Sequence, residues 1–437
     1  MRSDRNNAEQ SLQWIWWLHP ALLFALVVGG TFLVAAMQSD AAYRLYGTPK
    51  YVTAEHVLLA FAAIAAFGTG YQLSQSTGRI PHATPRRIHR VVRYAFWLTM
   101  LLTLVGYAAW LMVAVRNGLT LGMLREFLTT DDPEVWETLS KEVFVSWKGV
   151  TTASQFAVAA VPLGVWLYFD GERALIWPLT LLVALAAVRA IAFSERLAVI
   201  ELLLPIVVIG LRTCLLGKPV SKLTRRGLQF APLLGLAGLL VFFGGSEYLR
   251  SWRYYQHEFD SFADFTLWRM AGYYSTAHNN GAMALQTQPP YPLPYATIRS
   301  IWLIPGLSTT PLGYQNITGI DPAERHEQML EQFGTPELNN EGGLFQPALD
   351  FGLGGFLLFW LASGFISGRL YRHYLVGTLA GLTMYPLIII AILETPRFLY
   401  LCYTRALPGL VVLGIVLWLA RRPASSAVVP APAVSIG

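Results

Sequence analysis

Long runs of apolar residues, separated by short polar segments, dominate this chain of 437 residues. A helix needs about 20 mainly apolar residues to cross a bilayer, and these runs have that length. We predict transmembrane spans near residues 13–37, 52–73, 92–115, 150–169, 174–193, 197–216, 228–246, 346–371, 375–394 and 397–420. The first run is longer than the apolar part of a signal peptide, so we expect it to stay as a span. The pattern therefore predicts an all-α, polytopic transmembrane helix bundle of about ten spans.

Basic residues gather in alternate connections between these spans, after the second, sixth, eighth and tenth. They are Arg79, Arg86, Arg87, Arg90, Arg93, Arg212, Lys218, Lys222, Arg225, Arg226, Arg369, Arg372, Arg421 and Arg422. Short loops rich in arginine and lysine stay in the cytoplasm. We therefore expect both termini inside and the other connections outside.

The division of the chain follows from these spans. Residues 1–246 hold the first seven spans, 247–345 a large outer loop, 346–420 the last three spans, and 421–437 a disordered cytoplasmic tail. A loop of about a hundred residues without structure would be unusual, so 247–345 is expected to fold. We predict an amphipathic helix within 254–285 and a short helix within 321–333. Asp321 would cap the short helix, and Pro322 would occupy its first position.

Composition agrees with a membrane protein, since 54% of residues are hydrophobic and only 13% are charged. Soluble domains carry about 25% charged residues. The net charge of +6 does not indicate a nucleic-acid partner, because the cations lie in short loops. The chain has no GxxxxGK[ST], GxSxG, HExxH or CxxC sequence, so ATP hydrolysis, serine esterase and zinc chemistry lack support. We expect no metal, no cofactor and no disulfide between Cys214 and Cys402.

Ionisable residues at membrane depth are costly and indicate function. Five arginines near the outer side form the predicted substrate-binding set: Arg189, Arg196, Arg269, Arg397 and Arg405. Guanidinium groups bind phosphate at two points and stay charged in partly dry surroundings. We expect Arg397 and Arg405 to project from one face of the tenth span. A structural pair between Arg405 and an interior carboxylate, and a local salt bridge between Glu394 and Arg397, are the alternatives.

Three further residues are candidates for catalysis. His278 lies in a polar stretch and has a side chain that titrates near neutral pH, so it is a candidate general base. Glu341 follows two asparagines and is a second candidate base, and Asp350 lies near the start of the eighth span. The alternatives are a structural histidine, a solvated Glu341 and an aspartate favoured by a helix N-terminus.

The outer loop is rich in arginine and aromatic residues. Arg299 belongs to it, with a solvated or headgroup-facing charge as the simpler interpretation. The aromatic residues are Trp252, Tyr254, Tyr255, Trp268, Tyr273, Tyr274, Tyr291, Tyr295 and Trp302. Such side chains form interfacial belts in membrane proteins, and two or three of them are candidates for stacking on sugar rings.

The chain resembles the bacterial O-antigen polymerases, the Wzy-type oligosaccharide repeat unit polymerases. The resemblance rests on the number of spans, the large late loop, residues 339–343, the segment 350–355 and the small-residue stretch 364–371. It implies a metal-independent membrane glycosyltransferase that joins undecaprenyl-pyrophosphate-linked repeats at the outer face of the bacterial inner membrane, in making O-antigen, lipopolysaccharide or exopolysaccharide. The arginine–glycine spacing R-x(10)-G of that family is not matched from Arg269, Arg299, Arg397 or Arg405.

The resemblance also implies partners. They are the lipid-linked glycan, the bilayer, and a chain-length regulator and a flippase as candidate protein partners. The alternative functions are an O-antigen ligase, a lipid-linked oligosaccharide transporter or flippase, and a non-enzymatic assembly component.

Overall fold

The computed structural model describes residues 12–76, 86–123, 125, 142–145, 147, 150–193, 197–215 and 220–421. The described residues form helices and connecting segments, and no strand occurs among them. The all-α class predicted from the sequence is thereby confirmed. The predictions that fall outside the described residues concern Arg79, Arg196, Lys218 and the tail after residue 421.

Eight helices of the described residues are long and apolar enough to cross a membrane. They are α2 (Pro20–Met37), α4 (Ala54–Gln75), α5 (Arg86–Arg116), η3 with α8 (Thr151–Phe156 and Ala157–Phe169), η4 with α9 (Arg173–Leu175 and Ile176–Phe193), α10 (Leu197–Leu215), α11 (Lys222–Glu247) and α17 (Gln346–Val376). The predicted ninth and tenth spans correspond to two shorter apolar helices, α18 (Leu379–Glu394) and α19 (Leu407–Arg421). The chain is therefore of the multi-pass membrane class, and the count of ten spans stays a prediction.

The tenth predicted span is wrong in one respect. It was expected to be one helix from residue 397, but only a short 3₁₀ turn, η9 (Tyr400–Cys402), precedes α19, which begins at Leu407. Pro408 is tolerated in the first turn of that helix, where its missing N–H costs nothing. Arg397 and Arg405 therefore do not share a helix face, and both lie in the connection between α18 and α19.

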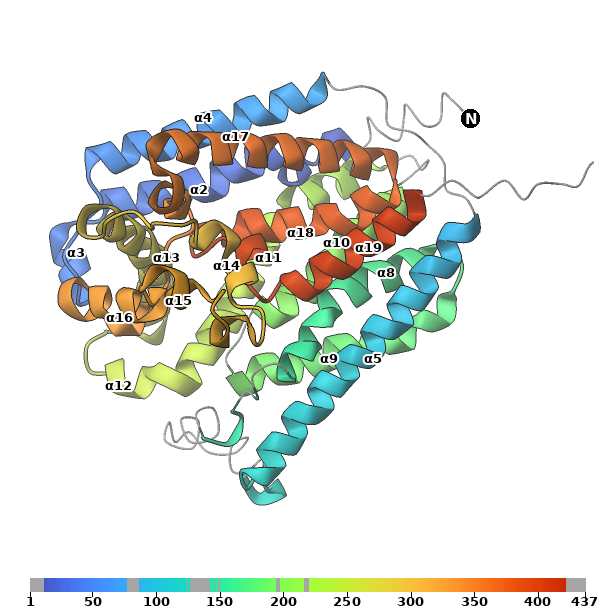
Figure 1. The fold of residues 1–437 in the computed structure, drawn as a ribbon, viewed down its shortest axis with the longest axis horizontal. Coiled ribbons are helices and arrows are strands. Elements are labelled where there is room, and N and C mark those ends of the chain that lie inside the picture. Colours follow the sequence, from blue (N-terminus) through green and yellow to red (C-terminus); the bar gives the residue numbers. More distant parts are fainter. Residues whose placement is uncertain are drawn as a thin grey trace, which may run out of the picture.

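Helices α4 and α17 lie side by side along the bundle (Figure 1). Glycines bring their backbones together: a Cβ atom on Gly70 would lie 1.9 Å from the carbonyl oxygen of Leu361. A Cβ atom on Gly364 would lie 2.0 Å from the carbonyl oxygen of Phe67. Small residues at such crossings allow close van der Waals packing, which drives helix association in lipid.

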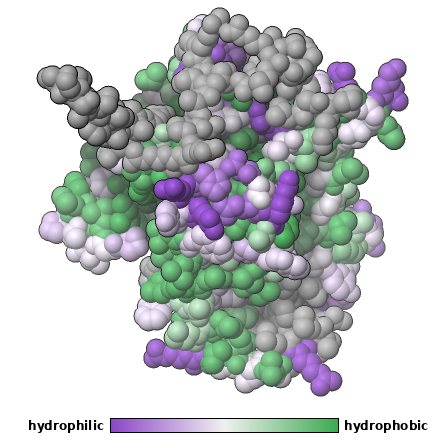
Figure 2. Space-filling model, turned by 90° about the vertical axis from the view of Figure 1, so that its right-hand side faces the viewer, coloured by the Kyte–Doolittle hydropathy of each residue, from purple (hydrophilic) through white to green (hydrophobic). Residues whose placement is uncertain are grey.

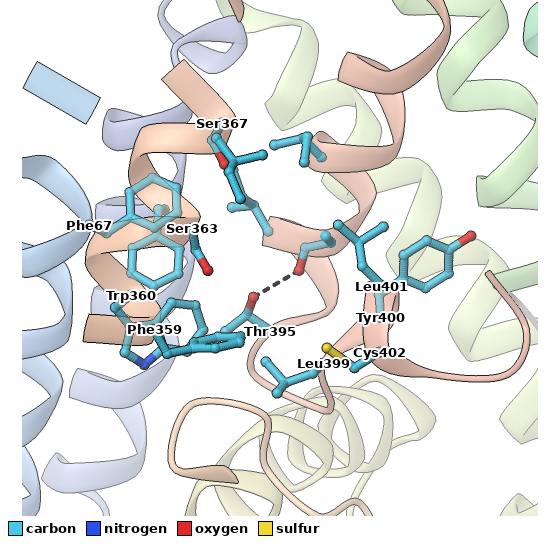
Figure 3. A pocket seen from close by; sticks show the side chains of 15 residues that line it. Phe67, Phe359, Trp360, Ser363, Ser367, Thr395, Leu399, Tyr400, Leu401 and Cys402 are labelled. Carbon is cyan, nitrogen blue, oxygen red and sulfur yellow. Dashed lines mark hydrogen bonds between the residues drawn. The ribbon is translucent and has the colours of Figure 1, made fainter. Parts of the chain in front are cut away.

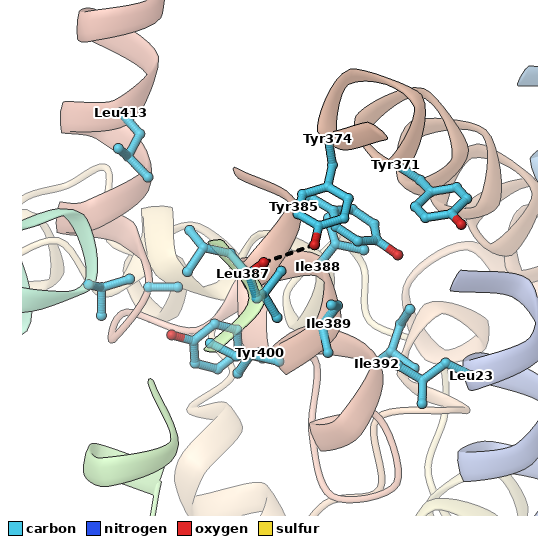
Figure 4. Close-up of a cluster of buried hydrophobic side chains, with 14 of the residues drawn as sticks. Leu23, Tyr371, Tyr374, Tyr385, Leu387, Ile388, Ile389, Ile392, Tyr400 and Leu413 are labelled. Carbon is cyan, nitrogen blue, oxygen red and sulfur yellow. Dashed lines mark hydrogen bonds between the residues drawn. The ribbon is translucent and has the colours of Figure 1, made fainter. Parts of the chain in front are cut away.

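Helix α18 lies in the middle of the bundle, and most of its side chains are buried. Figure 4 shows Leu387, Ile388 and Ile389 of α18 among residues of α2, α17 and α19. Tyr385 of the same helix donates its hydroxyl to the backbone of Leu18. A helix that is apolar all round is expected to be covered by other helices.

The segment after α11 folds into helices at one end of the bundle (Figure 1). These helices are α12 (Arg253–Tyr255), α13 (Phe262–Thr287), α14 (Arg299–Trp302), α15 (Tyr314–Thr318) and α16 (Pro322–Phe333). Two sequence predictions are confirmed here. A helix, α13, occupies much of 254–285, although the run from Ser275 to Ala284 is buried on all sides. Helix α16 begins at Pro322, with the Asp321 carboxylate accepting the N–H groups of Ala323 and Glu324.

The opposite end of the bundle holds described basic residues that were predicted to share one side. Arg372 near the end of α17 donates to the carbonyl oxygen of Ser74 at the end of α4. Arg212 near the end of α10 donates to the carbonyl oxygen of Tyr374. Figure 2 looks onto this end and shows hydrophilic side chains gathered at its middle, with hydrophobic side chains around them. Placing this end in the cytoplasm stays a prediction.

Candidate functional site

The connection between α18 and α19 meets the helical segment of residues 248–345 at one end of the bundle. Two arginines, one glutamate and two tyrosines lie together there, and we call them the arginine–tyrosine cluster. Its members are Arg299, Glu341, Arg397, Tyr273 and Tyr403.

Arg397 is held on several sides within this cluster. Its Nη1 donates to the Glu394 carboxylate at 2.7 Å, and its Nη2 donates to the Tyr273 hydroxyl at 2.6 Å. The guanidinium carbon also lies 4.7 Å from the centre of the Tyr273 ring. The local salt bridge with Glu394, weighed as an alternative from the sequence, is therefore present. The Nε atom of Arg397 is buried and has no acceptor, so this arginine keeps one unused donor.

Arg299 and Glu341 form the second charged pair of the cluster. Arg299 Nη1 donates to Glu341 Oε1 at 2.5 Å, and Gln346 Nε2 donates to the other carboxylate oxygen at 2.6 Å. Burial opposes ionisation of Glu341, but Arg299 outweighs it and holds the pKa of this carboxyl below its usual value. Glu341 is therefore a carboxylate at neutral pH. The Nε atom of Arg299 is buried and lacks an acceptor, as in Arg397.

Aromatic rings join the two charged pairs. The Arg299 guanidinium lies 4.4 Å from the centre of the Tyr403 ring, a cation–π distance. The Tyr403 ring in turn lies 4.7 Å from the ring of Phe398, the residue after Arg397. Sequence reasoning missed Tyr403, because it expected a continuous helix there. It treated Arg299 as a solvated charge, whereas only 15% of this side chain is exposed.

Glycines bring the turn that carries Glu341 against the connection between α18 and α19. The N–H of Gly342 donates to the carbonyl oxygen of Arg397 at 2.9 Å. Gly342 has a φ of +70°, and a Cβ atom there would lie 2.2 Å from the carbonyl oxygen of Ala277. Gly343 packs as closely against the backbone of Thr395 and Phe398. No larger residue fits these two positions without moving the backbone.

The polar stretch of α13 holds the surrounding connections in place. Asn280 donates its amide to the carbonyl oxygens of Leu338 and Asn340, just before Glu341. Asn279 accepts the N–H of Tyr51 at 2.6 Å and donates to the carbonyl oxygen of Pro49. These asparagines are fully buried, so their role is to satisfy the backbone of irregular segments.

His278 lies away from the cluster's surface. It has no exposed area, its Nε2 is 2.9 Å from Thr31 Oγ1, and its Nδ1 has no partner. Burial lowers the pKa of His278 to about 3, so the ring is neutral at physiological pH. A side chain without exposed surface does not reach a substrate hydroxyl in this conformation, and the contacts match the structural alternative.

Asp350 organises the segment that carries Arg299. Its carboxylate accepts the N–H groups of Tyr295, Ala296 and Thr297 at 2.7–3.1 Å, and the Thr297 hydroxyl at 2.6 Å. Asp350 was expected in the first turn of its helix, where the helix N-terminus would favour an acid. That reason is wrong, because α17 begins at Gln346 and its first turn contains no acid. The backbone N–H groups of residues 295–297, and not a helix N-terminus, stabilise the Asp350 carboxylate.

The other predicted arginines are dispersed. Arg405 Nε donates to both carboxylate oxygens of Glu201 on α10 at 2.7 Å, which is the structural pair weighed from the sequence. Arg269 on α13 pairs with Glu337 at 2.6 Å and with Glu247 at 3.4 Å. Arg189 donates to the Ser154 hydroxyl at 2.8 Å. Among the predicted arginines that the structure describes, only Arg397 lies beside Glu341.

An apolar pocket of about 120 Å³ lies beside the cluster, between α17 and α18 (Figure 3). Its lining residues are Phe24, Phe67, Phe359, Trp360, Ser363, Ile366, Ser367, Ile388, Ala391, Ile392, Thr395, Leu399, Tyr400, Leu401 and Cys402.

In the part of the chain that the structure describes, no three histidine, cysteine or acidic side chains are placed to hold a metal ion. The cluster therefore offers guanidinium donors, one carboxylate and aromatic faces.

Comparisons with protein-family models, with curated proteins and with solved structures found no match to this chain. The fold and the site define a multi-pass, all-α membrane protein with an arginine–tyrosine cluster at one end of its bundle.

Proposed function

We propose that this protein is a membrane glycosyltransferase that polymerises oligosaccharide repeats linked to a polyprenyl pyrophosphate on the outer face of the cytoplasmic membrane. The arginine–tyrosine cluster would be its active site. The observation that carries the proposal is the position of Arg299 and Arg397 beside Glu341, at the end of the bundle that carries α12 to α16.

The two arginines suit a leaving pyrophosphate. Arg299 and Arg397 keep 15% and 18% of their side chains exposed, and guanidinium groups bind phosphate oxygens at two points. Their ion pairs with Glu341 and Glu394 hold the guanidinium groups in fixed positions before substrate arrives. Fixed donors that face a developing negative charge stabilise a transition state without reorganisation. Arg397 and Arg299 would thus neutralise the charge that grows on the departing pyrophosphate.

Glu341 is the candidate base of this reaction. The acceptor hydroxyl of one repeat would attack the anomeric carbon of another, the bond from that carbon to the pyrophosphate oxygen would break, and the proton would pass to Glu341. A carboxylate performs this task in inverting glycosidases, where the sugar carries positive charge in the transition state. Glu341 is ionised at neutral pH, which is the protonation state that a general base requires. Tyr273 and Tyr403 would present their ring faces to the glycan.

The test is a reaction with purified full-length protein in detergent and polyprenyl-pyrophosphate-linked repeats as the only substrate. A polymerase alone produces a ladder of glycan lengths on the lipid. A product that forms only when a separate lipid acceptor is added would indicate a ligase instead. Absence of any new glycosidic bond in both reactions, with folded protein, would overturn the proposal.

A further inference from the structure

The apolar pocket shares a wall with the arginine–tyrosine cluster. Thr395 and the four residues from Leu399 to Cys402 line the pocket, while Arg397 and Tyr403 of the same connection belong to the cluster. One short segment of chain thus has an apolar side and a charged side. Along α18 the lining runs from Thr395 to Ile388, a depth of about 10 Å at 1.5 Å per residue.

The pocket lining reaches the outer surface of α17, a helix long and apolar enough to cross a membrane. Ile366 on its rim is 53% exposed, whereas Ser367, Trp360 and Ile392 are buried. In Figure 3, Ser363 and Ser367 of α17 lie on one side of the pocket, and Leu399 to Cys402 lie on the other. A chain held at one point in this pocket can therefore continue into the bilayer without crossing the protein.

The size and lining of the pocket restrict the ligand. A cavity of about 150 Å³ lined by apolar side chains holds a benzene molecule, so about 120 Å³ suits a group of about five carbons. Five aromatic residues form much of the wall: Phe24, Phe67, Phe359, Trp360 and Tyr400. A compact space of this kind is filled better by a branched unit than by a thin straight chain.

We infer that the pocket between α17 and α18 binds one branched five-carbon unit of the isoprenoid tail while Arg299 and Arg397 bind its pyrophosphate. This inference rests on the proposed function and names the part of the lipid that the site would recognise. The ligand is an amphiphile whose charge and first apolar units lie on the two sides of residues 395–403. Selectivity for branched over straight lipid chains follows from it.

The experiment measures binding of three probes to the purified full-length protein: geranylgeranyl pyrophosphate, hexadecyl pyrophosphate and inorganic pyrophosphate. Ala391→Phe fills the pocket from α18, and Ser363→Leu fills it less severely from α17. Leu358→Phe is the control, since Leu358 lies on α17 but is 65% exposed and does not line the pocket. Thermal unfolding in detergent selects the variants that fold, and Ser363→Leu serves if Ala391→Phe does not.

We expect the pocket-filling variants to lose at least tenfold in affinity for geranylgeranyl pyrophosphate and to keep their affinity for inorganic pyrophosphate. Leu358→Phe should match the wild type, and hexadecyl pyrophosphate should bind the wild type more weakly than the branched probe. Unchanged binding of geranylgeranyl pyrophosphate in folded pocket-filling variants would overturn the inference. If Arg397→Ala then still weakens all three probes, the proposed active site survives. If Arg397→Ala changes the affinity for none of the three probes, both the inference and the proposed function are contradicted.

Discussion

At the residue scale, charge pairing decides which of the arginines are available to a ligand. Arg405 gives its Nε to both oxygens of Glu201, and Arg269 is shared between two glutamates. Breaking a buried pair leaves an uncompensated charge, so such arginines contribute chiefly to the fold. Arg299 and Arg397 also pair with acids, but both lie beside Glu341 with 15% and 18% of their side chains exposed. The structure thus separates Arg397 from Arg269 and Arg405, which the sequence placed in one group, and adds Arg299 beside it.

Glu341 provides a pH-dependent test at this scale. Its folded-state pKa lies below the ordinary 4.5, because Arg299 outweighs the effect of burial. A depressed carboxyl pKa stabilises the folded protein above the unfolded pKa and loses that contribution as pH falls through the folded value. We predict that wild-type protein in detergent loses melting temperature more steeply below pH 4.5 than Glu341→Gln does. Parallel pH profiles for the two proteins would show that the ion pair contributes nothing.

Asp350 should act through the backbone that it binds. Asp350→Ala leaves three backbone N–H groups without their acceptor, and each buried unsatisfied group costs about 1–3 kcal/mol. We expect a loss of stability of about 3 kcal/mol. Asp350→Asn, which keeps one acceptor oxygen, should lose less. Denaturant unfolding measures both, with the exposed Glu331→Ala on α16 as control. Equal stability of Asp350→Ala and wild type would contradict the hydrogen-bond network.

At the element scale, the bundle depends on close crossings rather than on apolar burial alone. Lipid offers side chains an apolar environment outside the protein, so packing has to distinguish the folded bundle. The crossing of α4 and α17 uses Gly70 and Gly364, where a Cβ atom would overlap a backbone carbonyl of the other helix. The last turn of α17 is joined to α10 by hydrogen bonds, because Arg212 donates to the backbone carbonyl oxygens of Tyr374 and Leu375.

Gly364→Ala tests this crossing directly. The added methyl group would lie 2.0 Å from the carbonyl oxygen of Phe67, so α4 and α17 must separate. Overpacking of this kind costs about 1–3 kcal/mol. Gly354→Ala lies on the same helix with open space around its Cβ atom, and it should be neutral. Melting temperatures of the two variants in one detergent make the comparison. A Gly364→Ala protein as stable as Gly354→Ala would refute the close approach.

The helices were largely predictable from the sequence, because long apolar runs indicate helices surrounded by lipid or by other helices. Capping residues and prolines mark where helices begin. Asp321 followed by Pro322 identified the start of α16 without any tertiary information. The break after Arg397 was not predictable, since Leu399 to Cys402 are apolar and read as helix. The cluster was hidden for another reason. Tyr273 and Arg397 are 124 residues apart, and no periodic pattern connects them.

At the scale of the whole molecule, the two ends of the bundle differ in charge and in the elements they carry. One end carries basic residues at the ends of α10 and α17 and at the start of α5. The other carries α12 to α16 and the arginine–tyrosine cluster (Figure 1). The positive-inside rule assigns the first end to the cytoplasm. We therefore predict that the proposed chemistry takes place on the side opposite to the one where nucleotides are available.

Labelling of single cysteines in intact cells tests this orientation. Cys214 and Cys402 are first replaced by serine, and a cysteine is introduced either at Glu331 on α16 or at Arg225 on α11. We predict that a membrane-impermeant maleimide labels Glu331→Cys in whole cells, and labels Arg225→Cys only after the membrane is opened. The reverse pattern would place the arginine–tyrosine cluster in the cytoplasm.

The most direct measurement of the central claim is the rate at which purified protein forms glycosidic bonds between lipid-linked repeats. Loss of one preorganised donor to a developing charge typically costs about a hundredfold or more in rate. We predict such a loss for Arg397→Ala and for Arg299→Ala. Arg173→Ala, at the opposite end of the bundle, should keep the wild-type rate. Wild-type rates in folded Arg397→Ala and Arg299→Ala would contradict the assignment of the arginine–tyrosine cluster as the active site.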